Sequence, residues 1–285
     1  MQQVTVRVPA STSNLGPGFD CLGVALRIYN NVVVTRGAKS RLPPIARAAA
    51  DLFFQRTRDT PFSFSISVKG DVPSSRGLGG SATVRLGILL AMNYLSGTRL
   101  EKSSIFQLCG QLEGHPDNAA PAAFGGFTIV REQNVQRFHV SPALFFVLLI
   151  PNFDVETLAA RKLLPLQVTR AAAIENSANA SAITAAFASG NYQNLRGAFR
   201  DQLHQPYREK LIPFLPHVIT AAEKAGALGA FLSGSGSTIA AVTLTKPRQI
   251  AEAMHRKIEK YDARTVIVCA DNRGARLVQS SISSH

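Results

Sequence analysis

The sequence predicts a two-domain α+β protein, and three observations support this class. The chain has 285 residues, which is enough to bury two moderate cores. In the first half, segments that alternate apolar and polar residues are mixed with segments whose apolar residues recur at helical spacing. After Pro151 helical segments dominate, so we expect a boundary there, with one domain over residues 1–151 and a second over 152–285.

Strands and helices alternate along the first half. Val4, Val6 and Val8 alternate with polar residues and predict a strand over 3–9. The apolar residues after Ser81 recur at helical spacing up to Gly97, which predicts a helix over 82–96. The same rules predict strands at 28–36, 62–69, 125–132, 135–140 and 144–150, and helices at 44–56 and 101–112.

The second half begins with helical segments, which we expect from about residue 156 to 225. A glycine-rich turn, Ser233-Gly-Ser-Gly-Ser237, then separates strands expected at 228–232 and 238–244. A helix at 247–259 and a strand at 264–270 complete the expected elements.

Composition excludes several classes of protein. The longest unbroken apolar run, Ala143–Ile150, is far shorter than the roughly 20 residues of a membrane span, and Met1–Pro9 lacks the apolar core of a signal peptide. We therefore expect a cytoplasmic protein without membrane contact. The three cysteines lack metal-site spacing. The formal charge of +13 comes from Lys and Arg residues that are scattered along the chain and form no basic block. We therefore expect an anionic small substrate or a plain basic surface, and no nucleic acid.

The stretch Val72–Thr83 has the pattern of a phosphate-binding turn. Glycines at 77, 79 and 80 permit positive φ and close approach to an anion, and we expect Ser81 to cap the helix that follows. The Walker pattern is absent. A nominal Rossmann match exists, but the preceding strand alternates like a half-exposed antiparallel strand, which argues against that fold. A triphosphate is the expected ligand.

Two further segments gather polar side chains. In Pro9–Asp20 a tight turn over Gly16–Gly18 brings Asn14 and Asp20 together; they either bind a substrate ammonium or hydroxyl or satisfy their own backbone.

Glu113-Gly-His-Pro-Asp-Asn118 gathers two carboxylates, an imidazole and an amide. Glu113 is a candidate Mg²⁺ ligand, and Asp117 or Asn118 is a candidate to orient an acceptor hydroxyl. His115 has either a structural or a catalytic role.

The motifs PASTSNLGPGFDCLG, VPSSRGLGGSA, EGHPDN and LSGSGST, in this order, resemble the GHMP kinase superfamily, and within it the homoserine kinases. The segments Thr157–Pro165 and Asp201–Arg208 favour the homoserine kinases further. The resemblance covers nearly the whole chain. It implies an N-terminal domain like ribosomal S5 domain 2 and a ferredoxin-like C-terminal domain, with the substrate between them. It also implies a homodimer, the assembly common in the family.

The resemblance also implies an activity: the γ-phosphoryl group of ATP passes to the hydroxyl of L-homoserine, giving O-phospho-L-homoserine on the way to threonine. Asn14 and Asp20 would meet the substrate ammonium, and Arg161 with Arg208 would hold its carboxylate, for which paired guanidinium groups are well suited. Asn118 would contact the acceptor hydroxyl.

The resemblance further implies that Thr157 would lie near the γ-phosphate and that Ser81 with Glu113 would hold Mg²⁺. Asn118, Thr157 and Arg161 form the expected catalytic group. His115 and Asp117 are weaker candidates for a proton acceptor beside the substrate. The residues expected around the triphosphate are Pro73, Ser74, Ser75, Arg76, Gly77, Leu78, Gly79, Gly80, Ser81, Ala82 and Thr83.

The chain departs from the family pattern at two positions that bear on the nucleotide. Gly80 stands where the family usually has serine, and Pro44 stands where an asparagine commonly contacts adenine. Selectivity for ATP over other purine triphosphates therefore stays open. Three alternatives remain: a related kinase acting on threonine, mevalonate or shikimate, a ligand-sensing relative without catalysis, and a nucleic-acid binder, whose affinity would fall steeply with salt.

Overall fold

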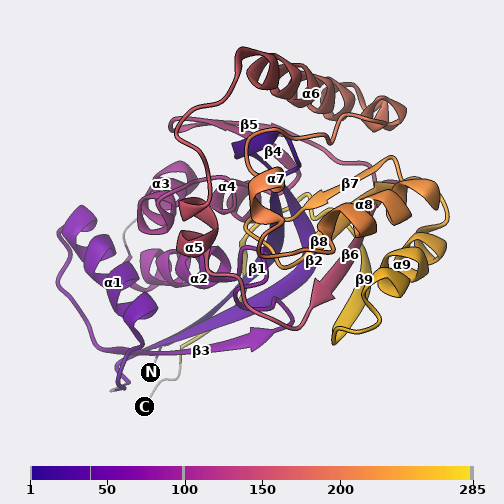
Figure 1. The fold of residues 1–285 in the computed structure, drawn as a ribbon. Helices are drawn as coiled ribbons and strands as arrows, with labels where there is room; N and C mark the ends of the chain where they lie inside the picture. The colour runs from indigo at the N-terminus through magenta and orange to yellow at the C-terminus, as the bar shows by residue number, and fades with distance from the viewer. Residues whose placement is uncertain (1, 39, 98–99, 283–285) are drawn as a thin grey trace.

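A computed structural model describes residues 2–38, 40–97 and 100–282 of the chain. Within them the fold is built on two sheets that lie side by side (Figure 1). The first has six strands in the order β10-β1-β2-β4-β5, with β3 also paired to β2, and the second has four in the order β7-β8-β6-β9. The predicted α+β class is confirmed.

The first sheet is organised by a long antiparallel hairpin of β1 and β2, which continues past the predicted strands up to the turn at Leu15–Pro17. β2 carries β3 on one stretch of its free edge and β4 on another. The strands of this sheet are β1 (Gln2–Asn14), β2 (Gly18–Arg36), β3 (Phe64–Gly70), β4 (Phe127–Arg131), β5 (Asn134–Phe138) and β10 (Arg276–Ile282).

Four helices cover one face of this sheet. Their apolar side chains pack on Val4, Val6 and Val8 of β1 and on Val32 and Val34 of β2, which project to this face because strand side chains alternate. The helices are α1 (Pro44–Thr57), α2 (Gly80–Leu95), α3 (Lys102–Glu113) and α4 (Ala119–Phe124). The helices expected at 44–56, 82–96 and 101–112 are confirmed, whereas α4 and the strand β10 were not predicted.

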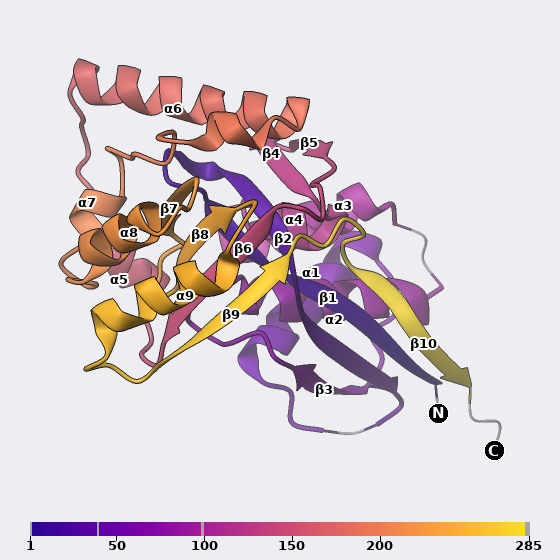
Figure 2. The ribbon, with the colours of Figure 1, turned by 90° about the vertical axis from the view of Figure 1, so that its right-hand side faces the viewer.

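The second sheet has the split β-α-β topology of a ferredoxin-like domain. Its strands are β6 (Phe145–Pro151), β7 (Gly229–Leu232), β8 (Ile239–Thr243) and β9 (Ala263–Cys269), all antiparallel to their neighbours. Figure 2 shows α8 (Leu215–Lys224) and α9 (Pro247–His255) together on one face of it. The remaining helices here are α5 (Thr157–Lys162), α6 (Arg170–Ser189) and α7 (Gln205–Arg208), with short 3₁₀ turns at Tyr192–Leu195 and Arg256–Ile258.

An apolar core joins the two sheets. Phe127 of β4 stacks on Phe187 of α6 at 4.2 Å between ring centroids, and Phe199 stacks on Phe231 of β7 at 5.2 Å. The sheets also exchange segments, since β6, which ends at Pro151, lies in the second sheet and β10 lies in the first. The division at residue 151 therefore stays a prediction. No helix in the described residues is long and apolar enough to cross a membrane.

Candidate functional site

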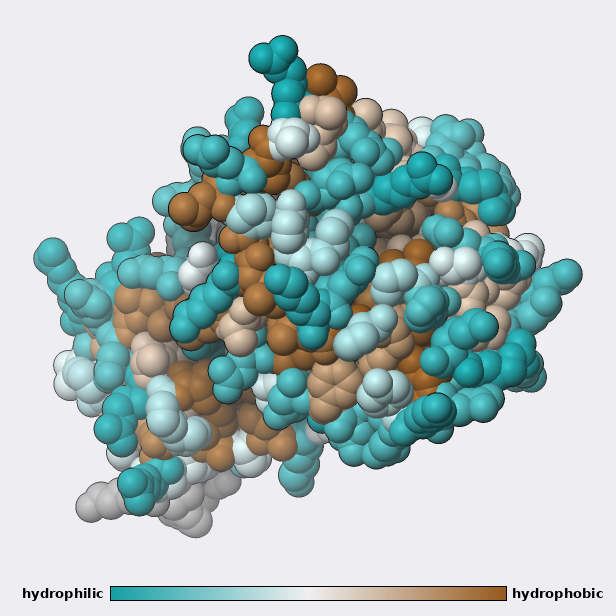
Figure 3. All heavy atoms as spheres, viewed as in Figure 1, coloured by the Kyte–Doolittle hydropathy of each residue, from teal (hydrophilic) through white to brown (hydrophobic). Residues whose placement is uncertain are grey.

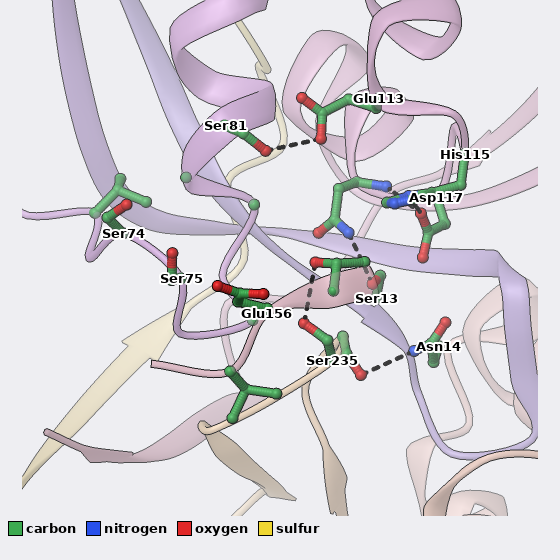
Figure 4. A pocket seen from close by; sticks show the side chains of 18 of the residues that line it. Ser13, Asn14, Ser74, Ser75, Ser81, Glu113, His115, Asp117, Glu156 and Ser235 are labelled. Atoms are coloured by element: carbon green, nitrogen blue, oxygen red, sulfur yellow. Dashed lines mark hydrogen bonds and ion pairs between the residues drawn. The ribbon is translucent and has the colours of Figure 1, made fainter. Parts of the chain in front are cut away.

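A cavity of about 510 Å³ opens where α2 begins. Its walls come from the β1–β2 turn, the loop before α2, the α3–α4 connection and the segments around α5 and α7. Side chains from distant motifs face one another across it, as Figure 4 shows for Ser81 and Glu113. The segments singled out in the sequence therefore meet in one place.

The loop before α2 is shaped by two glycines in the left-handed region. Gly77 has φ +73° and Gly79 has φ +67°, and a Cβ at Gly79 would lie 2.2 Å from Ser11 Oγ, so a larger residue does not fit. Gly80 differs from the prediction because its φ is not positive; it is the first residue of the helix. A Cβ there would lie 3.0 Å from Pro73 O, which makes a serine tight in this loop.

In this loop the backbone carbonyl groups accept hydrogen bonds, whereas several N–H groups donate none. The carbonyl of Ser75 accepts from Val155 N at 3.1 Å, that of Arg76 from Thr238 N at 3.2 Å, and that of Gly77 from Ser233 Oγ at 2.6 Å. The N–H groups of residues 77–79, in contrast, donate to no other described residue. Carbonyls turned into the protein and free N–H groups ahead of a helix N-terminus form an anion site.

Ser81 does not cap α2 as predicted. The N-cap residue is Gly79, without a side-chain cap, because the helix begins two residues earlier than expected. Ser81 Oγ instead donates to Glu113 Oε2 at 2.8 Å (Figure 4). The other carboxylate oxygen of Glu113 pairs with Arg85. A hydroxyl and a carboxylate thus lie together beside the free N–H groups of the loop.

At the β1–β2 turn, Asp20 is held by a basic residue of α5. Arg161 Nη1 donates to Asp20 Oδ2 at 2.9 Å and Nη2 donates to Oδ1 at 2.5 Å, a bidentate ion pair that raises the pKa of Arg161 although burial opposes it. Asn14 accepts from Asp20 N at 3.1 Å and donates to Gly234 O at 3.1 Å. Asn14 therefore satisfies backbone groups, and Asp20 lines the cavity, while the binding of a substrate by these residues stays a prediction.

The α3–α4 connection presents a second acidic group. Asp117 is 2 % exposed and accepts from His115 Nδ1 at 2.9 Å. This hydrogen bond is the main cause that raises the pKa of His115, while burial works against it. For Asp117 burial raises the pKa, yet the contact with His115 prevails and the pKa is lowered. The hydrogen bond therefore favours the charged form of both partners.

Asn118 has its amide fixed by β1. It accepts from Ser11 Oγ at 2.8 Å and donates to Ser13 Oγ at 3.0 Å, and all three side chains are buried. Thr157, the first residue of α5, lies on the far side, where its Oγ1 is 3.4 Å from Ser235 Oγ. Both residues line the cavity.

Arg208 is the least satisfied cation of the cavity. It is 2 % exposed, its Nε has no hydrogen-bond partner, and no ion pair of the described residues includes it. Burial, followed by the nearby charge of Arg161, lowers its pKa to about 10. The ring of Phe19 lies 5.3 Å from the guanidinium carbons of both Arg161 and Arg208. A buried, unpaired guanidinium in a cavity is a site for an anionic ligand group.

Most predicted residues line the cavity, and some do not. Arg161 and Arg208 both line it, and Arg161 forms a bidentate ion pair with Asp20, so their joint binding of a carboxylate stays a prediction. Among the predicted phosphate-loop residues, the side chains that are absent from the cavity wall belong to Pro73, Arg76, Leu78, Ala82 and Thr83. Leu78, Ala82 and Thr83 are buried in the fold, and Pro73 and Arg76 border a separate hollow behind the loop.

Sequence reasoning missed an apolar part of the wall. Ile45 of α1, Val68 of β3 and Val84 of α2 line it together with Val72, while Pro44 only begins α1. Val68 is 42 % exposed, and Figure 3 shows apolar atoms at the surface over α1 and β3. The half-exposed alternation of the predicted strand 62–69 was the available signal. Ser13, Phe19, Glu156 and Ser235 were also missed, although all four lie inside or beside recognised motifs.

Comparisons with known proteins agree with this geometry. Residues 44–126 match the family model of the GHMP kinases N terminal domain, and residues 183–260 match that of the GHMP kinases C terminal domain. A homoserine kinase of Nostoc punctiforme is 40 % identical over 84 % of this chain and 85 % of its own, and that of Caldicellulosiruptor bescii is 35 % identical over 98 % of both.

Solved structures extend the likeness to the fold. The crystal structure of homoserine kinase from Cytophaga hutchinsonii superposes with a TM-score of 0.88 at 25 % identity, covering 97 % of each chain. Mevalonate kinase of L. major, at 16 % identity over 92 % of this chain and 94 % of its own, shares the fold with a TM-score of 0.68. The chain belongs to the GHMP kinases and, among them, to the homoserine kinase family.

Proposed function

We propose that the chain transfers the γ-phosphoryl group of ATP to the hydroxyl of L-homoserine, giving O-phospho-L-homoserine. One observation carries the proposal: a loop with free N–H groups and a buried, unpaired Arg208 line the same cavity, together with the carboxylates of Asp20 and Asp117. An anion site for phosphates beside a site for a zwitterion is what an amino-acid kinase requires.

The loop fits the triphosphate. The N–H groups of residues 77–79 and the N-terminus of the 16-residue helix α2 offer donors to phosphate oxygens, and the absence of a Cβ at Gly79 keeps them accessible. The apolar wall of Ile45, Val68 and Val84 is suited to a nucleotide base. With no asparagine at position 44, we infer that apolar contact contributes more to base binding here than a side-chain hydrogen bond does.

Glu113 and Ser81 fit Mg²⁺. Among the described residues no three His, Cys, Asp or Glu side chains cluster as a metal site of their own. One carboxylate with one hydroxyl suits Mg²⁺ all the same, because this ion commonly takes one or two protein oxygens and completes its shell with phosphate and water. The bound ion would neutralise phosphate charge during transfer. Ser81 and Arg85 would keep Glu113 oriented toward it.

At the other end of the cavity, Arg208 would bind the substrate carboxylate, and Asp20 with Asn14 and Asp117 would surround its ammonium group. We infer that Asn118, fixed by Ser11 and Ser13, meets the acceptor hydroxyl, and that Thr157 lies near the transferred group. We infer that His115 and Asp117, which are hydrogen-bonded to each other, orient the substrate rather than remove a proton. Transfer through a loose transition state depends mainly on this positioning.

A coupled ADP-release assay tests the proposal. Homoserine, threonine, mevalonate and shikimate are compared as acceptors, each with ATP and with GTP. We expect turnover with homoserine and ATP to exceed that with mevalonate and shikimate by at least about a hundredfold, because Arg208 and Asp20 together need both charged groups of an amino acid, which threonine also carries. Equal activity on mevalonate would favour a different kinase of this family. No turnover with any acceptor, together with homoserine binding, would indicate a ligand sensor.

A matched pair of variants locates the acceptor site. Arg208→Met removes the buried charge inside the cavity, whereas Arg200→Met removes an exposed one on the same connection outside it. We expect the first to raise KM for homoserine strongly and the second to leave the kinetics unchanged.

We also propose a cytoplasmic location, which cell fractionation would check, and a homodimer, which light scattering would check.

A further inference from the structure

His204 is a buried side chain to which the proposed mechanism gives no role. It precedes α7, is 0 % exposed and stacks on Phe19 with ring centroids 5.1 Å apart. Both of its ring nitrogens have partners: Nε2 lies 2.8 Å from Gly16 O and Nδ1 lies 3.1 Å from Arg208 Nη1. The ring therefore connects the β1–β2 turn with the guanidinium of Arg208.

The partners determine where the proton of the ring lies. Gly16 O only accepts, so Nε2 must carry a hydrogen, and Arg208 only donates, so Nδ1 must be bare. Asp201, whose Oδ2 is 3.4 Å from Nε2, already accepts from the backbone N–H groups of His204 and Gln205. His204 is thus a neutral imidazole in the Nε2–H tautomer.

This arrangement leaves Nη2 of Arg208 for a ligand. Nη1 has two hydrogens, and both have acceptors: Gly234 O at 2.8 Å and His204 Nδ1. Nε is buried without a partner, and no hydrogen bond from Nη2 to a described residue occurs. Arg208 lines the cavity, so Nη2 is the donor of its guanidinium that remains for a carboxylate. The hydrogen bond with His204 therefore holds Nη1 and leaves Nη2 to meet the ligand.

We propose that His204 is a positioning residue for the substrate carboxylate: it accepts from Arg208 Nη1 and so presents Nη2 to the bound amino acid. The inference rests on the proposed function, because it assumes a ligand with a carboxylate. It also predicts that Arg208 binds the substrate carboxylate while Arg161 keeps its ion pair with Asp20.

Two substitutions separate the two nitrogens. In His204→Asn the side-chain oxygen takes the place of Nδ1 and still accepts from Arg208, whereas the donor to Gly16 is lost. In His204→Gln the amide nitrogen takes the place of Nε2 and still donates to Gly16, whereas the acceptor for Arg208 is lost. We expect His204→Gln to raise KM for homoserine by about tenfold or more, and His204→Asn to raise it by less than about threefold. KM for ATP and kcat should change little in both.

A substrate without a carboxylate supplies the control. 3-Aminopropan-1-ol is homoserine without that group, and its kcat/KM should be the same in wild type and His204→Gln. An equal loss with both substrates, or equal KM values for homoserine in the two variants, would overturn the assignment in favour of a purely structural histidine. Failure of the wild type to phosphorylate homoserine would instead contradict the proposed function.

A spectroscopic measurement keeps the inference testable should both variants fail to fold. ¹⁵N–¹H correlation spectra of histidine-labelled wild type should show His204 neutral, with the proton on Nε2, near neutral pH. A proton on Nδ1, or on both nitrogens, would overturn the proposal. Adding homoserine should leave the tautomer unchanged. In an arginine-labelled sample it should shift the Nη2 resonance of Arg208, because that donor gains its partner.

Discussion

Acid should destabilise this protein through His204. Burial, followed by the neighbouring charge of Arg208, lowers the pKa of His204 to about 4, although Asp201, Gly16 and Asp20 act in the opposite direction. In the unfolded chain the pKa returns to roughly 6.5. Between these two values the unfolded state binds a proton that the folded state does not, so the free energy of unfolding falls as the pH falls.

The size of the effect follows from the two pKa values. A difference of about 2.5 units corresponds to about 3 kcal/mol once the pH is below both, and to about 2 kcal/mol at pH 5. The chain has no tryptophan, so unfolding by guanidinium is best followed by far-ultraviolet circular dichroism. Wild type should lose about 2 kcal/mol more than His204→Asn between pH 7.5 and pH 5. Since the variant keeps every other titratable group, equal losses in the two proteins would refute the reasoning.

Three further outcomes are expected. Glu113→Gln should lower kcat by about tenfold or more while KM for homoserine changes little, because the carboxylate is proposed to hold Mg²⁺; near-normal turnover at limiting Mg²⁺ would discard that role. Gly79→Ala should cost about 1–3 kcal/mol and weaken ATP binding, since φ is +67° and the new Cβ meets Ser11 Oγ, and an unchanged unfolding midpoint would contradict this. Asp117→Asn should lower the pKa of His115, which an NMR titration measures directly; a pKa that stays in place would mean that Asp117 is not its main partner.

Local sequence patterns were sufficient to predict most helices and strands and to identify the motifs that lie together in the cavity. The glycine spacing identified the loop before α2, and the expected proximity of Ser81 and Glu113 is present as a hydrogen bond of 2.8 Å. These predictions succeed because φ preferences and apolar spacing are properties of neighbouring residues. β10 escaped prediction because its partner β1 lies more than 260 residues earlier in the chain.

The orientation of side chains in the site could not be read from the chain. Arg161 and Arg208 carry the same group, yet one is paired with Asp20 and the other has no carboxylate partner. That difference depends on which carboxylate the tertiary fold brings within reach. The same holds for His204, whose tautomer is decided by Gly16 and Arg208 from two separate elements. Sequence identifies the residue types of a site, whereas the long-range contacts decide their protonation and direction.

The position of β10 has a consequence for synthesis on the ribosome. The outer edge of β1, residues 2–7, pairs only with β10, which is made after the whole second sheet. Until then the nascent chain exposes unpaired backbone N–H and C=O groups along a strand of alternating valines, an arrangement prone to associate with other chains. We expect a product truncated before Arg276 to keep the residues that line the cavity and yet to aggregate, so that β10 contributes to solubility during translation.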